Sequence, residues 1–410
     1  MWPTPCALRS AGGRRDAARP LADRLARDGT LALGVAGVAG AVAGDAQCRT
    51  LGLTRPIAIP VASTRAGIMR HIDPARPDAF SPSDPMSILI CGGAGYIGSH
   101  MAKWLHARGI PVTILDNLST GHREATRHVR LIEADLADPA GLDAAFEQGP
   151  FDAVMHFCAS SLVGDSVRHP LDYYDNNVVG TLNLLRAMRY HGIGRLVFSS
   201  TAAVFGEPVH ARIDESHPTL PINPYGASKL MVERILRDVA QAHGLRSVAL
   251  RYFNAAGASP DGTIGEAHAH ETHLIPNAIA AARGGNRLCI FGDDWPTPDG
   301  TCVRDYIHVD DLAKAHWQAL DYMDAHAGAH AFNLGNGQGF SVREVVAAVE
   351  RVGGLPVPID IVARRPGDPA VLVAASALAQ RELGWQPDYT RLEDIVATAW
   401  RWHDGPGFAS

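Results

Sequence analysis

The stretch Ser87-Ile-Leu-Ile-Cys91-Gly92-Gly-Ala-Gly95-Tyr-Ile-Gly98 joins a short apolar run to a glycine-rich segment. The apolar run is typical of a buried parallel strand. The glycine spacing has a geometric reason: Gly92 permits a tight turn, Gly95 lets the backbone approach a pyrophosphate, and Gly98 lets the next helix pack on the strand. Amides at the start of that helix would face the phosphates. The stretch therefore predicts the first strand, turn and helix of a dinucleotide-binding fold.

Strand and helix patterns alternate downstream of this stretch. A helical pattern covers residues 96–108, and the apolar run Val112-Thr-Ile-Leu-Asp116 follows it. Further strand patterns lie at 130–133, 153–157, 196–200 and 248–252, and helical patterns between them cover 176–190 and 225–243. This alternation predicts an α/β protein with a doubly wound, parallel, Rossmann-type sheet.

The alternation breaks after Asn254. Residues 257–300 hold many Gly, Pro, Asp and His residues around one helical segment at 274–282. Ser341-Val-Arg-Glu344 is a capping box that opens a helix to residue 352, and a last helical pattern covers 392–402. We expect residues 86–254 to form an NAD-binding Rossmann domain, with segments returning to it near 304–322. Residues 255–410 would form mainly a smaller C-terminal lobe that binds the substrate.

Residues 1–85 differ in composition from the rest of the chain. They are rich in Ala, Arg, Gly and Pro, and Met86 stands directly before the first predicted strand. The apolar stretch at 31–44 is too short to span a bilayer, which needs about 20 apolar residues. We interpret 1–85 as a disordered leader, or as upstream DNA translated from a misassigned start.

Composition excludes several classes of protein. A formal charge of −6, with no long run of Lys or Arg, gives no reason to expect a nucleic acid partner. The six cysteines include no Cys-x-x-Cys pair, which argues against a zinc ribbon and a secreted disulfide framework. We expect a cytoplasmic protein without a membrane partner.

Acidic and aromatic residues follow three of the predicted strands. Asp116 ends the second strand, where an acid binds the adenosine ribose hydroxyls and repels a 2′-phosphate, so NAD is favoured over NADP. Asp135 follows the third strand, where it could bind an adenine edge or cap a helix. Phe157 ends the fourth strand, at the edge where ligands of open α/β sheets bind.

Two segments carry candidate catalytic residues. Ser199-Ser-Thr201 ends one strand, and Tyr225-Gly-Ala-Ser-Lys229 opens a helix on which the tyrosine and lysine share a face. A phenolate at neutral pH needs a pKa shift of about three units, roughly 4 kcal/mol. An ammonium at about 4 Å supplies a similar energy at an effective dielectric constant of 20. The pair could also be an ordinary surface pair, but after a dinucleotide fingerprint it predicts alcohol oxidation, with Thr201 relaying the proton.

Several long motifs carry a resemblance to a known family: GGAGYIGSH at Gly92, LDNLSTG at Leu115, YYDNNVVGT at Tyr173, NPYGASKLMVE at Asn223 and RYFNAAGA at Arg251. GDDWPTPDGTCVRDYIHVDDLA at Gly292 and RRPGD at Arg364 complete the set. With these motifs the chain, from residue 86 to about 402, resembles the extended short-chain dehydrogenase/reductases and, among them, the UDP-glucose 4-epimerase family.

The resemblance implies roles for individual residues. Tyr225 would be the catalytic base and acid, with Lys229 and Thr201 as its partners. The implied cofactor positions are Gly92, Gly95, Tyr96, Ile97, Gly98, Asp116, Asn117, Asp135, Leu136, Phe157, Asn176, Tyr225, Lys229 and Phe253. The implied UDP-sugar positions are Asn254, Leu274, Arg304, Arg365 and Asp368. Arginine also suits a diphosphate on its own chemistry, because its planar guanidinium matches the phosphate oxygens.

The resemblance also implies a reaction. NAD would oxidise the sugar C4 of UDP-glucose or UDP-galactose to a 4-keto intermediate, which turns over and is reduced on its other face. We expect a homodimer. A uronate epimerase or decarboxylase is one alternative, and a non-catalytic dinucleotide sensor is another. An NDP-sugar 4,6-dehydratase is disfavoured, because such enzymes carry Asp-Glu where Ala202-Ala203 follows Thr201 here.

Two further features bear on substrate and metal. Leu372 stands where members of the family can carry a tyrosine that narrows the sugar pocket, so it would leave room for a 2-acetamido group. Glu266, His268, His270 and His273 have the composition of a metal cluster, but nothing else in the sequence needs a metal, and we predict none.

Overall fold

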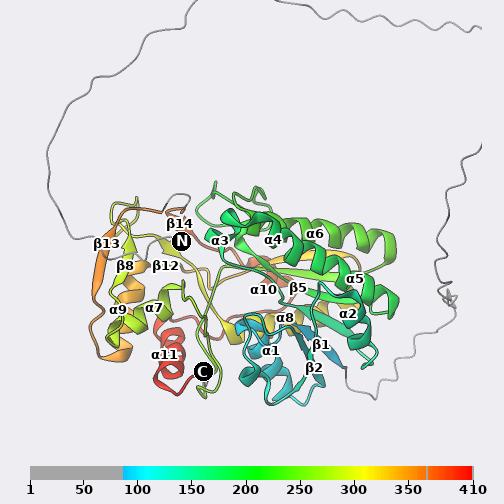
Figure 1. The fold of residues 1–410 in the computed structure, drawn as a ribbon. Coiled ribbons are helices and arrows are strands. Elements are labelled where there is room, and N and C mark those ends of the chain that lie inside the picture. The colour runs from blue at the N-terminus through cyan, green and yellow to red at the C-terminus, as the bar shows by residue number, and fades with distance from the viewer. Residues whose placement is uncertain (1–85, 366–367, 409–410) are drawn as a thin grey trace, which may run out of the picture. The chain divides into compact units, whose positions relative to one another are not determined.

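The computed structural model describes residues 86–365 and 368–408, all within the unit Pro77–Ser410. A parallel sheet of seven strands lies at its centre, in the order β11-β6-β5-β4-β1-β2-β3 (Figure 1). The strands are β1 (Ile88–Cys91), β2 (Val112–Asp116), β3 (Arg130–Glu133), β4 (Ala153–His156), β5 (Arg195–Thr201), β6 (Arg246–Tyr252) and β11 (Ala329–Leu334). The predicted fold class is confirmed. The predicted leader, residues 1–85, lies outside the described residues.

The order of the strands reverses beside β1. Ile88 of β1 pairs with Val112 of β2 on one side and with Ala153 of β4 on the other. The chain therefore winds outward to β3, crosses back, and winds outward again through β4, β5 and β6. Loops at the carboxyl ends of β1 and β4 diverge at such a reversal, and ligands of open α/β sheets bind in the crevice between them.

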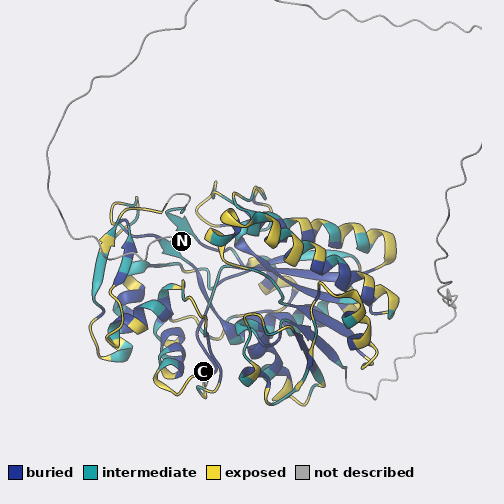
Figure 2. Ribbon diagram, viewed as in Figure 1, coloured by how far each residue is buried: buried dark blue, intermediate teal, exposed yellow. Residues whose placement is uncertain are grey.

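Successive side chains of β1 enter the cores on opposite faces of the sheet. Ile88 and Ile90 pack with residues of α1 and α8, whereas Leu89 and Cys91 pack with residues of α2, α5 and α6. These helices are α1 (Tyr96–His106), α2 (Pro139–Phe146), α5 (Gly180–Tyr190), α6 (Pro224–His243) and α8 (Val309–Ala325). Because both faces are covered, the inner strands β1, β2, β4, β5 and β6 form the buried layer of the domain, dark blue in Figure 2.

Short elements connect the strands near the carboxyl edge of the sheet. They are η1 (Arg123–Thr126), α3 (Val163–Arg168), α4 (Pro170–Tyr174), the π-helical η2 (Asp175–Val179), η3 (Ala202–Val204) and α10 (Ala377–Glu382). The helix predicted at 176–190 is therefore a π-helical turn that continues into α5.

A smaller lobe has its own hydrophobic core. Its helices are α7 (Leu274–Ala282), α9 (Val342–Gly353) and α11 (Leu392–Asp404), and they pack with residues of β8 (Leu288–Phe291) and β13 (Ile359–Val362). The remaining strands are β7 (Asn254–Ala256), paired with β10 (Tyr306–His308), and β9 (Val303–Arg304), paired with β12 (Phe340–Ser341) and β14 (Val371–Leu372). The predicted capping box at Ser341 is confirmed, with Ser341 and Glu344 bonding reciprocally.

One strand of the main sheet was not predicted. β11 pairs in parallel with β6 at the edge of the sheet. It lies later in the chain than residues 304–322, the segment that we expected to return to this domain. Only its second half, Phe332 to Leu334, is fully buried, so its sequence lacks the continuous apolar run of the inner strands.

None of the helices in the described part of the chain is long and apolar enough to cross a membrane.

Candidate active site

The glycine turn after β1 has the geometry that a dinucleotide pyrophosphate requires. Gly92 has φ +81°, and a Cβ there would lie 2.6 Å from the Cys158 backbone nitrogen. A Cβ on Gly98 would collide with the Gly92 carbonyl oxygen. Around Gly95 the nearest heavy atom to a Cβ is that same oxygen at 3.6 Å, so the space beside it is open. Gly95 also begins α1 without a side-chain cap, which leaves first-turn amides available to phosphate.

Asp116 holds the glycine turn against the end of β2. One carboxylate oxygen accepts a hydrogen bond from the Ala94 backbone at 2.9 Å, and the other accepts one from the Leu118 backbone at 2.8 Å. Each oxygen keeps a second lone pair. The residue can therefore organise the turn and still accept the ribose hydroxyls of NAD, so the site fits that cofactor.

Asp135 and Asn117 meet at the next position along the carboxyl edge. Asn117 Nδ2 donates to Asp135 Oδ2 at 2.9 Å, although the two residues follow different strands. The cap of α2 is Asp138, whose side chain accepts from the Ala140 backbone. The helix-cap interpretation of Asp135 is therefore wrong for α2, and its role at an adenine edge stays a prediction.

The other expected cofactor residues differ in their contacts and in how far they are buried. Tyr96 donates its hydroxyl to the Gly257 carbonyl oxygen at 2.6 Å, and Phe157 packs on His316 with ring centroids 4.7 Å apart. Ile97 packs at the edge of the α1 core, Leu136 is buried, and Phe253 packs beside Phe205.

Asn176 is exposed, and its amide donates to Asn177 Oδ1 at 3.0 Å. Asn177 was not predicted as a site residue. This buried side chain bonds both Ser160 and Ser228, so it joins the β4 loop to α6.

Tyr225 and Thr201 lie together where α6 begins and β5 ends. Burial raises the pKa of Tyr225, while a hydrogen bond with the Thr201 side chain opposes that rise. Asn223 caps α6 through a bond from the Gly226 backbone at 2.8 Å, which fixes the first turn that carries Tyr225. The structure thus brings two of the three predicted catalytic residues into direct interaction.

Lys229 is buried one turn further along α6. Its Nζ donates to the Ser199 carbonyl oxygen at 2.8 Å and lies 4.8 Å from the centre of the Phe198 ring. Burial lowers the pKa of Lys229 to about 7. One of its N–H groups is therefore used by the end of β5, and the expected contact with the Tyr225 phenol stays a prediction.

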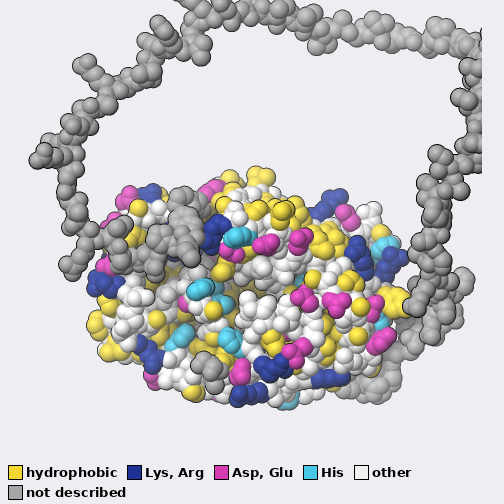
Figure 3. Space-filling view, viewed as in Figure 1, with side chains coloured by type: hydrophobic (Ala, Val, Ile, Leu, Met, Phe, Trp, Pro, Cys, Tyr) yellow, Lys and Arg dark blue, Asp and Glu magenta, His cyan; other side chains and the backbone are white. Residues whose placement is uncertain are grey.

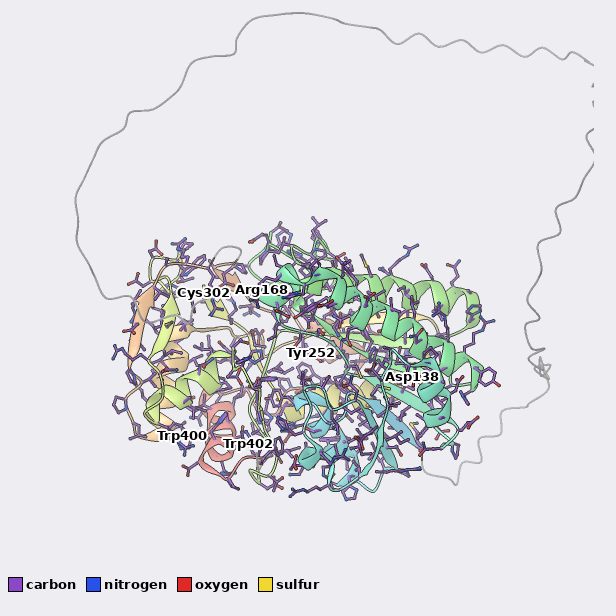
Figure 4. All side chains as sticks on the ribbon, in the orientation of Figure 1. Asp138, Arg168, Tyr252, Cys302, Trp400 and Trp402 are labelled. Atoms are coloured by element: carbon purple, nitrogen blue, oxygen red, sulfur yellow. The ribbon has the colours of Figure 1, made fainter. Side chains whose placement is uncertain are left out.

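A buried ion pair beneath these residues was missed by the sequence analysis. Glu233 accepts from Arg251 at 2.9 and 2.6 Å and from the Ser200 hydroxyl at 2.6 Å. Since Glu233 lies one turn beyond Lys229, these bonds tie α6 to both β5 and β6. Tyr252, at the end of β6, hydrogen-bonds Ser199 and lies near the middle of the molecule in Figure 4. The only sequence signal was the i, i+4 spacing of Tyr225, Lys229 and Glu233.

Four of the five expected substrate residues come from the smaller lobe, and Asn254 is the last residue of the predicted NAD-binding domain. An oxygen of Asp368 lies 3.7 Å from the guanidinium of Arg304, so the structure brings these two together. Arg365 stacks on the Phe291 ring at 3.6 Å. Asn254 donates its side-chain amide to the Asp305 carbonyl oxygen at 2.7 Å, and Leu274 is the first residue of α7.

Leu372 faces the catalytic end of β5. It packs on a small buried cluster that contains Ala202, Val204 and Phe205, the residues directly after Thr201. In β14 it pairs with Arg304 of β9. Leu372 thus joins the catalytic side of the crevice to the side that carries the expected substrate arginine.

Comparisons with known proteins agree on one family. Residues 88–335 match the NAD dependent epimerase/dehydratase family. A Halalkalibacterium halodurans protein named UDP-glucose 4-epimerase is 51% identical over 319 residues, 78% of this chain and 96% of that protein. The crystal structure of UDP-glucose 4-epimerase from Brucella ovis in complex with NAD matches with TM-score 0.75 and 49% identity, over 76% of this chain and 97% of that one. The UDP-Glc/GlcNAc 4-epimerase from Campylobacter jejuni matches with TM-score 0.69 and 44% identity, over 78% and 99%.

Proposed function

Since the chain belongs to the NAD-dependent epimerase/dehydratase family, we propose that it interconverts UDP-glucose and UDP-galactose with Tyr225 as the proton-transfer group. The observation that supports this most is the interaction of Tyr225 with Thr201 at the carboxyl edge of the sheet, beside a glycine turn with open space for a pyrophosphate. Residues 86–254, completed by α8 and β11, serve as the NAD-binding domain. Residues 255–410 supply mainly the UDP-sugar-binding lobe.

NAD⁺, when bound, accepts a hydride from C4 of the sugar and returns it to the other face. The chain supplies the proton chemistry. Tyr225 takes the proton of the 4-hydroxyl as the 4-keto sugar forms, and gives it back on reduction. Thr201 holds the phenol oxygen by its hydrogen bond. Lys229, when protonated, has three N–H donors, and Ser199 uses one of them, so two remain for the cofactor side of the site.

The smaller lobe holds the part of the substrate that does not react. Arg304 and Arg365 bind the diphosphate, while Asn254, Leu274 and Asp368 complete the UDP site. Binding energy spent on the nucleotide fixes the substrate without fixing the sugar ring. A weakly held 4-keto sugar can then rotate and present its opposite face for reduction.

Two alternative functions fit the residues of this site less well than epimerisation does. Elimination of water by a dehydratase requires an acid and a base near the sugar, but Ala202 and Ala203 follow Thr201, and the Ala203 backbone N–H only donates to the Thr201 hydroxyl. A non-catalytic dinucleotide sensor does not require the buried Tyr225–Lys229 arrangement.

A coupled assay tests the function directly. Purified protein is given UDP-galactose, and UDP-glucose is detected by a UDP-glucose dehydrogenase that reduces added NAD⁺. We expect steady turnover without added NAD⁺ in a discontinuous version of the assay, because the cofactor is regenerated within each cycle. Absence of turnover by protein that binds NAD and UDP would identify a sensor, and a 4-keto-6-deoxy product would identify a dehydratase.

The homodimer is supported by an apolar face. Leu162, Val163, Val167, Leu171 and Met231 are exposed on or beside α3, α4 and α6. Figure 3 shows hydrophobic side chains gathered over these helices. Contiguous exposed apolar surface of this kind marks protein–protein contact sites. Val167→Glu should convert the dimer to a monomer in light scattering, whereas an unchanged mass would place the interface elsewhere. We expect the enzyme to act in the cytoplasm.

A further inference from the structure

The loop between β7 and α7 gathers four potential metal ligands. They are Glu266, His268, Glu271 and His273, and one ligand atom from each lies within 4.8 Å of all the others. From the sequence, His270 was expected in this cluster and Glu271 was not. In the structure His270 is exposed and outside the cluster, and Glu271 takes its place.

The distances around the cluster resemble the edges of a tetrahedron. His268 Nδ1 lies 3.3 Å from an oxygen of Glu266 and 3.3 Å from an oxygen of Glu271. His273 Nδ1 lies 3.2 Å from Glu271 Oε1 and 2.5 Å from Glu266 Oε1. Ligands at 2.0–2.1 Å from a tetrahedral zinc ion are about 3.3 Å apart. Both separations from His268 Nδ1, to Glu266 Oε1 and to Glu271 Oε2, match that geometry, whereas the 3.2 Å contact of His273 is with the other Glu271 oxygen. The two histidines present the same ring atom.

Glu266 supplies a second, independent observation. Its side chain is only 5% exposed, and its Oε1 receives no hydrogen bond of acceptable geometry although His273 Nδ1 lies 2.5 Å away. A buried carboxylate needs a compensating partner, because desolvation of its charge is costly. The oxygen is aimed into the cluster, where a cation would satisfy it.

The backbone around the cluster is fixed by neighbouring elements. Trp402 of α11 donates its indole N–H to the Glu266 carbonyl oxygen at 2.9 Å, and His122 bonds the Ala267 carbonyl at 2.8 Å. Asn277 of α7 donates to the His273 carbonyl at 2.9 Å. Trp402 lies low in the smaller lobe in Figure 4, and histidines gather over α7 and α11 in Figure 3. The ligands are thus held in place by contacts that do not depend on a metal.

Glu271 is oriented by its own turn. Its Oε1 accepts the Thr272 and His273 backbone N–H groups, each at 2.7 Å. These bonds leave Oε2 facing His268. Hydrogen bonds of this kind around a ligand fix its orientation, as they do in known metal sites.

We propose that Glu266, His268, Glu271 and His273 form a structural site for a divalent transition-metal ion, zinc by preference. Two imidazoles with two carboxylates suit zinc, whereas calcium and magnesium prefer oxygen ligands alone. The doubly charged ion neutralises the two carboxylates. Four protein ligands fill a tetrahedral shell, so the ion fastens the loop before α7 and takes no part in the reaction. The proposal does not depend on the proposed function.

Protonation of both histidines, His268 and His273, is the alternative to a bound metal ion. The neighbouring carboxylates of Glu266 and Glu271 raise the pKa of His268 to about 9, so a pair of imidazolium ions could balance the same charge. In that alternative the two imidazolium ions balance the charge of the two carboxylates, and no metal ion is bound. Metal binding therefore decides between the two.

The test measures metal binding by the full chain, prepared without a histidine tag. After dialysis against chelator, Co²⁺ is titrated and its visible absorption recorded, and Zn²⁺ is measured by competition and by elemental analysis. We expect one ion per chain and the strong absorption of four-coordinate Co²⁺. His268→Ala and His273→Ala should each weaken binding at least tenfold, and the double variant at least 100-fold. His270→Ala is the matched control and should bind as the wild type does.

Two results would overturn the proposal. One is a wild type that binds less than one equivalent of Zn²⁺ or Co²⁺, as expected for two protonated histidines. The other is an equal loss of binding in His270→Ala. Should the cluster variants fail to fold, X-ray absorption of the zinc-loaded wild type decides instead. Nitrogen and oxygen ligands at about 2.0–2.2 Å support the site, and sulfur ligands at about 2.3 Å contradict it.

Discussion

Glu233 and Arg251 form a bidentate ion pair that is buried between α6 and β6, with contacts of 2.9 and 2.6 Å and side-chain exposures of 5% and 7%. The same carboxylate accepts the Ser200 hydroxyl, which lies directly before Thr201. The pair therefore connects the helix of Tyr225 and Lys229 to the two strands that end at the site. We expect it to affect the reaction only by positioning these residues.

Glu233→Gln should lower the free energy of unfolding by about 3 kcal/mol, because it leaves the buried Arg251 guanidinium without its counter-charge. Urea denaturation measures the change. Asp238→Asn, on the same helix, breaks only the exposed Arg234–Asp238 pair and should cost less than about 0.5 kcal/mol. Equal losses in the two variants would mean that the buried pair contributes nothing particular.

Tyr225→Phe should lower kcat by about 10²–10⁴-fold, the usual contribution of a positioned acid–base group. The fold and the bound NAD should be retained, because the ring remains. The coupled assay and the circular dichroism spectrum check both points. Tyr190→Phe, at a tyrosine that is 76% exposed, is the control and should leave kcat unchanged. Near-normal turnover of Tyr225→Phe would show that another group moves the proton.

Purified wild type should carry NAD without any being added, and Gly95→Val should not. The structure leaves open space where the new side chain would point, so the variant should fold while its methyl groups occupy the place of the pyrophosphate. Denaturation releases the nucleotide for chromatographic identification. Gly194→Val, also at a site with open space, should keep its NAD. Retention of NAD by Gly95→Val, or release of NADP from the wild type, would contradict the assignment of this turn.

The stability of nucleotide-free protein should rise with pH because of Lys229. Burial lowers its pKa to about 7, whereas a lysine in an unfolded chain has a pKa of about 10.4. Between these values the unfolded state binds more protons, so the free energy of unfolding increases as pH rises. Relative to Lys229→Met, the wild type should gain about 3 kcal/mol between pH 7 and 9.5. A constant difference between the two proteins over that range would show that the lysine is not desolvated.

The sequence predicted the fold well where local and long-range signals agree. The inner strands combine a continuous apolar run with burial on both faces, and β2 and β3 begin and end at the predicted residues. β11 lacks that signal, because only half of it is buried at the sheet edge. Its pairing with β6 depends on a tertiary contact that no local pattern reports.

The sequence predicted which residue types form the site better than it predicted which of these residues contact one another. Tyr225 and Thr201 meet, but Lys229 bonds the Ser199 carbonyl, since that backbone acceptor lies within reach of the buried ammonium. Glu233 was overlooked because a charged residue on a helix usually faces solvent. Glu271 was overlooked because the turn that aims its carboxylate at the histidines is set by backbone hydrogen bonds, which spacing alone does not reveal.

The last prediction concerns the width of the sugar pocket. Leu372 packs on the buried cluster that contains Ala202, Val204 and Phe205, and it pairs with Arg304 of β9. A leucine there is shorter than a tyrosine and can change rotamer, so it leaves room for a 2-acetamido group while the sugar rotates. The room is limited, since Val371 and Val373 flank it in the chain.

We expect the wild type to epimerise UDP-N-acetylglucosamine more slowly than UDP-glucose, because extra space in an apolar pocket discriminates by only about 1–3 kcal/mol. Leu372→Tyr should abolish the acetylated activity and largely spare the other, since the added ring would occupy the space that the acetamido group needs. The ratio of kcat/KM for the two substrates measures this. Leu220→Tyr, at a position that is 70% exposed, is the control and should leave the ratio unchanged. An unchanged ratio in Leu372→Tyr, or a wild type without acetylated turnover, would show that the pocket is limited by another residue.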